Sequence, residues 1–202
     1  MRRKAAECLL KTEAVFFRPD DPFTWASGIK SPIYCDNRLV LSDPQSRETI
    51  EEGLIALIRS EYPEAEALFG TATAGIAHAA IAAHEMGLPM GYVRSSAKDH
   101  GRGSRIEGRV LSGQKVVVVE DLISTGGSVI SAAKALEEAG AEVLGVVCIF
   151  SYNLNKSREA FAEANLEYKS LTDFDAACEA AAETGYIKPA DIDRLMEFRN
   201  SL

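Results

Sequence analysis

Residues 116–128 constrain the fold of this chain more than any other part of its sequence. They begin with four consecutive valines, continue with Glu120 and Asp121, and pass through small and hydroxyl-bearing residues to a helical pattern over 129–139. A run of β-branched residues is typical of a strand that is buried on both faces, as in a parallel sheet. The stretch therefore predicts a central strand that the two carboxylates end, followed by a loop and the start of a helix.

The loop that follows the two carboxylates has the composition of an anion-binding turn. Gly126 and Gly127 permit backbone conformations that are closed to other residues, and Ser124, Thr125 and Ser128 add hydroxyl groups. Because backbone N–H groups converge at a helix N-terminus, a phosphate fits there. The carboxylates would repel that phosphate but suit sugar hydroxyls, so the motif indicates a ribose phosphate. The alternative is an ordinary buried strand and turn without a ligand.

The composition is that of a soluble globular protein with one sizeable core. The 202 residues are 47% hydrophobic and 26% charged, and no apolar run approaches the length of a membrane span. The formal net charge of −8 argues against general affinity for nucleic acid or for an anionic membrane, since basic surface drives both interactions. The cysteines lack Cys-x-x-Cys spacing and the N-terminus lacks a signal-peptide pattern, which together predict reduced thiols and a cytoplasmic protein.

Strand and helix patterns alternate from residue 67 to residue 150. This alternation predicts an α/β fold with a twisted, mainly parallel sheet and helices on both faces. Ligands of such sheets bind at the carboxyl ends of the strands, where Glu120 and Asp121 stand. The loop at 71–75, between another strand and helix, is either a second anion site or a tight turn. Further helices are expected over 3–17, 49–60, 157–164, 173–183 and 189–198.

The segment 94–109 is basic and rich in glycine within an acidic chain. Five of its residues are Arg or Lys, against one Asp and one Glu, and almost none is apolar. Alone, such a segment would be interpreted as a solvated loop. Beside a phosphate site, a mobile basic loop can close over a diphosphate, with Arg94, Lys98 and His100 as cations or proton donors.

Residues 23–38 predict a β-hairpin near the N-terminus. A Ser-Gly turn separates an aromatic strand-like piece from one in which apolar and polar residues alternate. Phe23, Trp25 and Tyr34 are either hydrophobic filler or part of a binding surface, and their spacing leaves both interpretations open.

Three separated segments resemble the type I phosphoribosyltransferases. Residues 116–128 are similar to the signature with which this family binds 5-phosphoribosyl 1-diphosphate, and residues 23–34 and 92–101 are characteristic of its orotate branch. The resemblance covers nearly the whole chain. It implies the type I phosphoribosyltransferase fold as a single domain over 1–202, in which residues about 1–40 contribute a small hood over the base site.

The resemblance also implies a reaction and an assembly. The orotate branch transfers 5-phosphoribose from 5-phosphoribosyl 1-diphosphate to orotate, giving orotidine 5′-monophosphate and diphosphate in pyrimidine biosynthesis. Mg²⁺ would be held mainly through the diphosphate and the ribose rather than by direct protein ligands. The expected assembly is a homodimer in which each basic loop reaches into the neighbour's site. The open alternatives are a phosphoribosyltransferase for a purine base and a non-enzymatic regulator that senses the sugar diphosphate.

Site residues follow from the same resemblance, motif by motif. The residues implied for binding diphosphate are Arg94, Lys98 and His100. Those implied for binding ribose phosphate are Glu120, Asp121, Leu122, Ile123, Ser124, Thr125, Gly126, Gly127 and Ser128. Those implied for contacting orotate are Ser124, Ile33 and Tyr34. The residues implied for catalysis are Lys98, His100 and Asp121.

The sequence departs from part of the family at three places. Ser95 and Ser96 stand where a basic residue often follows Arg94, and Ala26 replaces a lysine that some members use. Residues 151–153, Ser-Tyr-Asn, lack the arginine that some members place after the final strand to bind orotate. The contact to the orotate carboxylate is therefore open.

Overall fold

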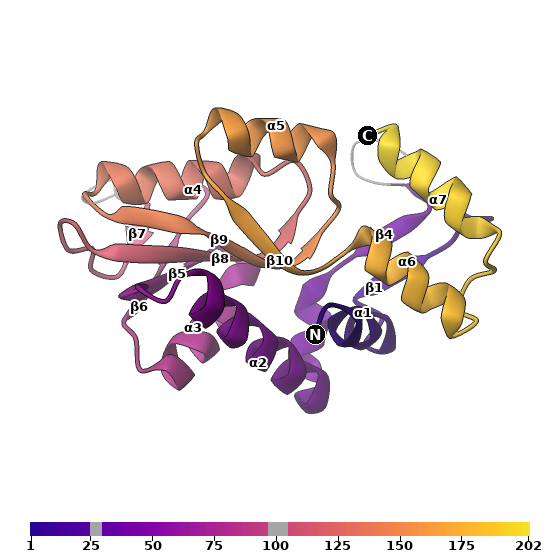
Figure 1. Cartoon of the computed structure of the whole chain (residues 1–202), viewed down its shortest axis with the longest axis horizontal. Helices are drawn as coiled ribbons and strands as arrows, with labels where there is room; N and C mark the ends of the chain where they lie inside the picture. Colours follow the sequence, from indigo (N-terminus) through magenta and orange to yellow (C-terminus); the bar gives the residue numbers. More distant parts are fainter. Residues whose placement is uncertain (25–29, 97–104) are drawn as a thin grey trace.

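A six-stranded sheet forms the centre of the molecule (Figure 1). The computed structural model describes residues 1–24, 30–96 and 105–202. The strand order is β10-β9-β8-β5-β6-β7, and every neighbouring pair is parallel except β6 with β7. The strands are β5 (Ala67–Thr71), β6 (Met90–Val93), β7 (Ile106–Glu107), β8 (Lys115–Ile123), β9 (Glu142–Ser151) and β10 (Tyr168–Asp173). The predicted α/β fold with a mainly parallel sheet is confirmed.

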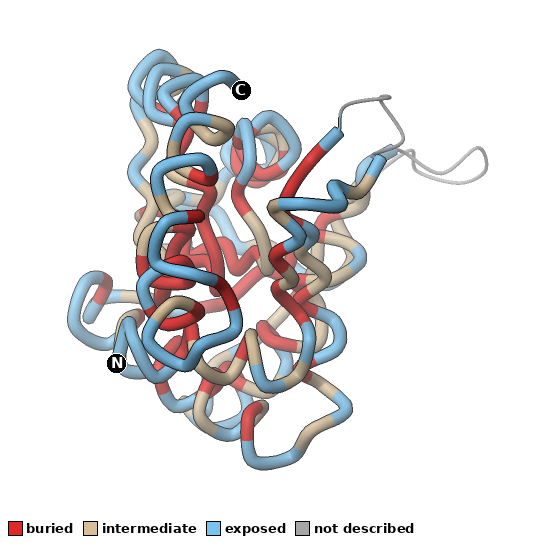
Figure 2. Tube along the Cα trace, turned by 90° about the vertical axis from the view of Figure 1, so that its right-hand side faces the viewer, coloured by how far each residue is buried: buried red, intermediate tan, exposed pale blue. Residues whose placement is uncertain are grey.

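Helices cover both faces of this sheet. α2 (Pro44–Glu61) and α3 (Ala74–Met86) lie on one face, whereas α4 (Gly127–Glu138) and α5 (Asn155–Glu163) lie on the other. The odd-numbered valines of β8 pack into the core on the α2 and α3 side, and its even-numbered valines pack into the core on the α4 side. Both faces of the strand are therefore apolar, which explains its four consecutive valines. Figure 2 shows the buried residues gathered along the centre of the fold.

The N-terminal residues form a helix and two small antiparallel sheets beside the main sheet (Figure 1). Their elements are α1 (Arg2–Lys11), β1 (Val15–Phe17), β2 (Phe23–Thr24), β3 (Lys30–Ser31), β4 (Ile33–Cys35) and the 3₁₀ helix η1 (Asn37–Ser42). The predicted hairpin is confirmed, because β2 pairs with β3. β4 pairs instead with β1. The hairpin turn, with Trp25 and Ala26, lies outside the described residues.

The helix predicted over 3–17 is wrong beyond Lys11, where α1 ends. Glu13 has a φ of 56°, a left-handed conformation that interrupts a right-handed helix. Val15–Phe17 then forms β1, since valine and phenylalanine favour extended backbone. The apolar residues of β1 thus match the helical spacing only by coincidence.

Two C-terminal helices complete the fold next to α1. α6 (Phe174–Glu183) and α7 (Asp191–Asn200) confirm the helices predicted there, and α1 packs against α6. Arg2 joins the start of α1 to the end of β10 by donating from Nε and Nη2 to the carboxylate of Asp173 at 2.7 and 2.6 Å. Asp173 also caps α6, because its Oδ1 accepts a hydrogen bond from the backbone N–H of Ala176 at 3.0 Å.

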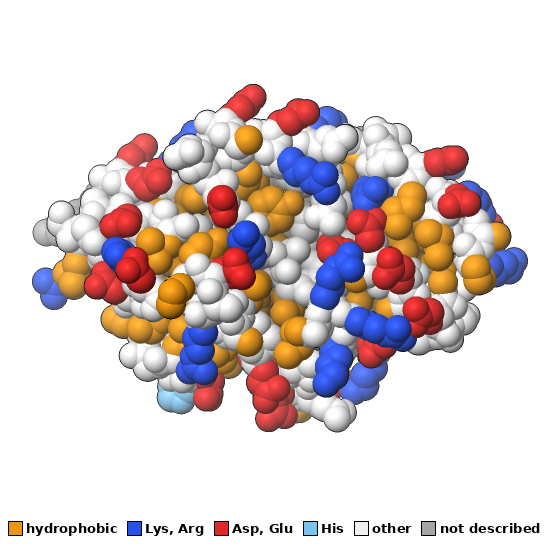
Figure 3. All heavy atoms as spheres, viewed as in Figure 1, with side chains coloured by type: hydrophobic (Ala, Val, Ile, Leu, Met, Phe, Trp, Pro, Cys, Tyr) orange, Lys and Arg blue, Asp and Glu red, His pale blue; other side chains and the backbone are white. Residues whose placement is uncertain are grey.

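The surface in Figure 3 carries charges of both signs, interspersed rather than separated. All four cysteines are unpaired thiols, as predicted. No helix within the described parts of the chain is both long enough and apolar enough to cross a membrane.

Candidate functional site

The carboxyl end of β8 carries Glu120 and Asp121 beyond the end of its neighbour β5. Pairing with β5 runs from Val116 to Val119, whereas pairing with β9 continues to Ile123. The prediction that the two carboxylates end the strand is therefore wrong, because the longer strand β9 extends the ladder past them. The acids stand at the edge of the sheet where ligands of parallel sheets bind.

The turn after β8 leads directly into α4. Ser124 and Thr125 are exposed, and Gly126 caps the helix in a left-handed conformation with φ of 84°. A Cβ atom at this glycine would lie 2.6 Å from Cε2 of Phe161, so another residue would meet both strain and a clash. The first N–H groups of a helix have no acceptors within it, and no side chain of the described residues caps α4. These groups, with the exposed hydroxyl of Ser128, are available to an anion.

Glu120 is a buried acid whose pKa is raised. It is 7% exposed, and its Oε1 accepts a hydrogen bond from the backbone N–H of Asp121 at 3.0 Å. Burial first, and then hydrogen bonding with the Asp121 carboxyl group, raises the pKa of Glu120 to about 8, while a hydrogen bond with Thr71 opposes this shift. The protonated carboxyl group can donate as well as accept hydrogen bonds, which suits a sugar diol.

We expect this raised pKa to make the stability of the protein depend on pH. An unperturbed glutamate titrates at 4.5, so between that value and about 8 the folded chain binds more protons than the unfolded chain. The free energy of unfolding therefore falls as pH rises through this window. Glu120→Gln removes the titrating group and with it this dependence on pH. Between about pH 5.5 and pH 9 the free energy of unfolding of the wild type should therefore fall by on the order of a few kcal/mol more than that of the variant. Urea unfolding of both proteins at both pH values measures the difference, and parallel pH dependences would contradict it.

The loop between β5 and α3 lies against the end of β8. Thr71 Oγ1 donates to the backbone oxygen of Val119 at 3.3 Å, and a Cβ atom on Gly75 would lie 2.4 Å from that oxygen. This close approach explains the small residues at the loop, since α3 could not begin so near the strand with a larger side chain. It supports the tight-turn interpretation, and the second anion site at 71–75 stays a prediction.

Arg94 follows β6, which lies two strands from β8 in the sheet. Its Nη1 is buried, has no hydrogen-bond partner among the described residues, and lies 3.9 Å from Oε1 of Glu107. Arg105 donates from Nε to the backbone oxygen of Arg94 and from Nη1 to Oγ of Ser131, both at 2.9 Å. Ser131 belongs to α4, the helix that follows the turn at 124–128. Arg105 therefore links Arg94 to that helix.

β4 places its two predicted orotate-contacting residues in different surroundings. Ile33 is fully buried in the core, whereas Tyr34 is 41% exposed. Side chains alternate along a strand, which accounts for the difference. The centroid of the Tyr34 ring lies 5.7 Å from the centroid of the Phe23 ring, and the two rings are tilted relative to each other. The backbone N–H of Ile33 donates to Oγ of Ser31 at 3.2 Å and its oxygen accepts from the same hydroxyl at 2.7 Å, so the orotate contact of Ile33 stays a prediction.

Asn37, which the sequence analysis did not single out, connects this N-terminal segment to β8. It is fully buried, and its Nδ2 donates to the backbone oxygen of Asp121 at 2.7 Å. The two residues are 84 positions apart in the chain, so no local pattern could pair them.

The structure thus gathers one continuous group of the predicted site residues. This group runs from β8 into α4 and consists of Glu120, Asp121, Leu122, Ile123, Ser124, Thr125, Gly126, Gly127 and Ser128. Arg94 is separate from this group, because it follows β6 and the strand β5 lies between β6 and β8. Lys98 and His100 lie outside the described residues, so their roles stay predictions.

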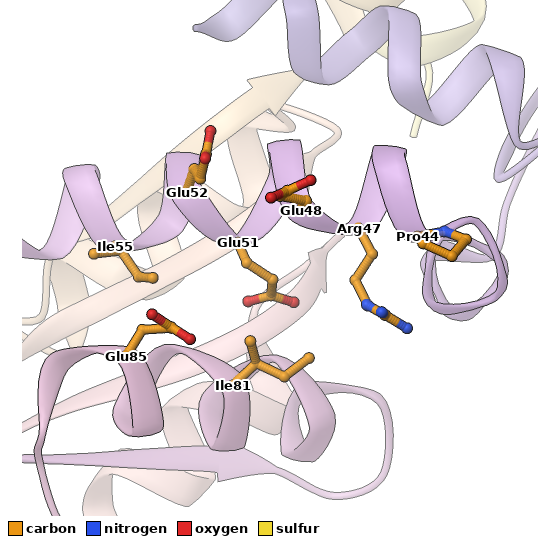
Figure 4. Close-up of a pocket in the computed structure, with 8 residues that line it drawn as sticks. All are labelled: Pro44, Arg47, Glu48, Glu51, Glu52, Ile55, Ile81 and Glu85. Atoms are coloured by element: carbon orange, nitrogen blue, oxygen red, sulfur yellow. The ribbon is translucent and has the colours of Figure 1, made fainter.

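A separate groove lies between α2 and α3 (Figure 4). At its base, Oε1 of the buried Glu51 lies 2.6 Å from Nδ1 of His78, which joins the two helices. The groove is lined by Pro44, Arg47, Glu48, Glu51, Glu52, Ile55, Ile81 and Glu85. It contains none of the predicted site residues, and its mainly acidic charge is unsuited to an anionic substrate. The end of β8 is therefore the candidate site.

Known proteins are similar to this chain over the region that contains the site. The family described as phosphoribosyl transferase domain matches residues 42–180. An orotate phosphoribosyltransferase of Bacillus subtilis (strain 168) is 56% identical over 201 residues, which cover 100% of this chain and 93% of that protein. One of Enterococcus faecalis (strain ATCC 700802 / V583) is 55% identical over 197 residues, covering 98% and 94%. The crystal structure of orotate phosphoribosyltransferase from Aeropyrum pernix matches with a TM-score of 0.77 and 28% identity, covering 90% of this chain and 98% of that one.

Proposed function

The chain belongs to the orotate phosphoribosyltransferase family, and from this premise we propose that it transfers 5-phosphoribose from 5-phosphoribosyl 1-diphosphate to a ring nitrogen of orotate. The products are orotidine 5′-monophosphate and diphosphate, formed in pyrimidine biosynthesis. The observation that carries the proposal is the passage from Glu120 to Ser128, where a carboxylate pair leads into a glycine turn at a helix N-terminus. This arrangement suits a ribose phosphate, because it offers acceptors to the diol and backbone N–H groups to the phosphate.

The turn at 124–128 would hold the 5′-phosphate of the ribose. Its exposed hydroxyls and the uncapped N-terminus of α4 support this role. Glu120 and Asp121 would bind the ribose diol, and Leu122 and Ile123 would connect the residues that bind the diol to those that bind the phosphate. Orotate would lie near Ser124 and Tyr34, where an exposed hydroxyl and an exposed ring are available.

The proposed reaction separates charge along one bond. As the anomeric carbon leaves the diphosphate, positive charge builds on the ribose and negative charge builds on the leaving group. Asp121 would stabilise the ribose, whereas Arg94 and Lys98 would stabilise the diphosphate. His100 would assist departure of the diphosphate. No covalent nucleophile is needed, and the ring nitrogen of orotate is acidic enough that no essential base is needed either.

We propose that Mg²⁺ enters the site with the diphosphate. Carboxylate oxygens are ligands that Mg²⁺ prefers, and a cation nearby would favour the charged form of Glu120, whose pKa is raised by burial in its absence. No cluster of three or more His, Cys, Asp or Glu side chains in the described parts of the chain is arranged to hold one. We propose that the substrates supply most of the ligands, with Glu120 and Asp121 beside them. When bound, the ion neutralises charge on the diphosphate.

The proposed hood and dimer complete the site. Tyr34 is exposed on β4 and Asn37 is bonded to Asp121, which supports residues 1–40 as a hood over the base. The backbone N–H of Arg94 donates to the backbone oxygen of Arg105 at 2.8 Å, and the ten residues between them could extend about 15 Å from that point. That length can cross a subunit interface, so we propose a homodimer with shared sites. The four free thiols suit a reducing compartment, and we propose the cytoplasm.

A panel of bases tests the proposed function against its alternatives. Steady-state rates are measured with orotate, adenine, xanthine and uracil at saturating 5-phosphoribosyl 1-diphosphate and Mg²⁺. We expect turnover with orotate at a kcat/KM at least about 10³-fold above that for any other base, because a site that hydrogen-bonds one base leaves polar groups unpaired with another. Preference for a purine would replace the assignment. Binding of the sugar diphosphate without turnover of any base would indicate a regulator.

A further inference from the structure

Asn37 is a buried amide that joins the two halves of the proposed site. Its Nδ2 donates to the backbone oxygen of Asp121 at 2.7 Å, and its Oδ1 accepts from the thiol of Cys35 at 3.4 Å. Because Asn37 is 0% exposed, bulk water does not compete for either hydrogen bond. A thiol is a weak donor, so the stronger of the two bonds is the one to Asp121.

The Asn37 amide bonds to β8 at a point where β9, and no longer β5, pairs with that strand. Pairing of β8 with β5 ends at Val119, so Asp121 lies beyond that ladder. The Asn37 side chain is fully buried, so without this acceptor its amide would be left as an unpaired donor away from water. An asparagine side chain is short and carries both a donor and an acceptor, and so can bond to β8 and to Cys35 at once.

The same residue holds the segment that carries Tyr34. Asn37 begins η1 and follows β4 after a single residue, Asp36. The carboxylate of Asp36 accepts from Nε and Nη2 of Arg38 at 2.6 and 2.7 Å, which secures the start of η1 from the solvent side. β4 itself pairs with β1, where Tyr34 lies opposite Phe16. The position of Tyr34 relative to Asp121 therefore depends on the Asn37 amide.

We propose that Asn37 is a positioning residue for phosphoribosyl transfer, which fixes the base-contacting segment relative to the carboxylate beside the ribose. The inference rests on the proposed function and assigns Asn37 no contact with either substrate. Reacting atoms must approach to about 3–3.5 Å, and a displacement of about 1 Å can cost about 10²-fold in rate. The hydrogen bond from Asn37 to Asp121 links the two substrate-binding segments and so affects the distance between the reacting atoms.

Asn37→Ala tests the proposal through the separate kinetic constants. We expect kcat to fall by about 10- to 100-fold and KM for orotate to rise by about 10-fold. The Kd for 5-phosphoribosyl 1-diphosphate, measured by calorimetry, should change by less than about threefold, because the phosphate turn is built on α4 rather than on the N-terminal segment. A purely structural role would lower the active fraction without this division between the two substrates.

Two variants serve as matched controls. Cys35→Ala removes the thiol on the other side of the amide and leaves the bond to Asp121, so its constants should stay within about threefold of wild type. Thr184→Ala removes a hydroxyl that donates to the backbone oxygen of Ala180 at 2.8 Å, at the end of α6, and reports the effect of lost stability alone. If Asn37→Ala does not fold, Asn37→Ser, which keeps a small polar group at the buried position, is measured in its place.

Three results would overturn the proposal. These are a folded Asn37 variant with wild-type constants, equal losses in the Asn37 and Cys35 variants, and a loss of sugar diphosphate affinity that parallels the loss of kcat. Turnover by the wild type is measured first, so failure of the proposed function appears in the wild type and failure of this inference appears only in the variants.

Discussion

Asp121→Asn is expected to lower kcat on the order of 10²-fold or more with little change in the fold. The substitution keeps the size of the side chain and leaves the backbone carbonyl that Asn37 holds. It removes only the negative charge, which in the proposed reaction lies where the ribose becomes positive. Steady-state kinetics with both substrates varied, alongside circular dichroism, measures the effect.

Asp20→Asn is the matched control for this charge. Asp20 lies on the surface, where its Oδ1 accepts from Nη1 of Arg194 at 2.9 Å, and the same chemical change there should leave kcat within about twofold. A change in the Asp121 variant that is confined to KM would make Asp121 a binding group and would contradict its proposed role in the transition state.

The second large effect is expected from mixing two inactive variants. Lys98→Ala and Asp121→Asn should each be nearly inactive alone. If Lys98 of one subunit serves the 120–128 site of the other, a mixed dimer has one site with both parts intact and one site with both changes. Random reassembly of equal amounts makes about half of the dimers mixed, so about a quarter of wild-type activity should return.

The control for this experiment is subunit exchange itself. Exchange is followed with two differently tagged wild-type preparations under the same conditions, and activity is then measured in the variant mixture. If Lys98 acts within its own chain, every site keeps one lesion. An exchanged mixture with no more activity than the separate variants would rule out the shared site.

Residues 116–128 could be interpreted from sequence because their signals are local. Four valines in succession indicate burial on both faces, and both cores of the sheet contain them. Gly126 indicates a turn position that only glycine can occupy. Its φ of 84° and its closeness to Phe161 explain why a side chain does not fit there. Properties that depend on a residue and its immediate neighbours are visible in the sequence.

Other features depend on partners that are distant in the chain. β8 continues past Glu120 and Asp121 because β9 pairs with it there. β10 was not predicted, since Tyr168–Asp173 has a mixed polar sequence and becomes a strand by pairing with β9. The bonds from Asn37 to Asp121 and from Thr71 to Val119 cross 84 and 48 positions. Such contacts follow from the assembled sheet rather than from any local pattern.

The central claim is that the end of β8 and the start of α4 serve transfer of phosphoribose to orotate. Phosphorus-31 NMR of the wild-type protein with 5-phosphoribosyl 1-diphosphate, orotate and Mg²⁺ follows substrate and both products at once. We expect orotidine 5′-monophosphate and diphosphate to appear in equal amounts, and only when orotate is present. Diphosphate release that does not depend on orotate, or no conversion by folded protein that binds the sugar diphosphate, would contradict the claim.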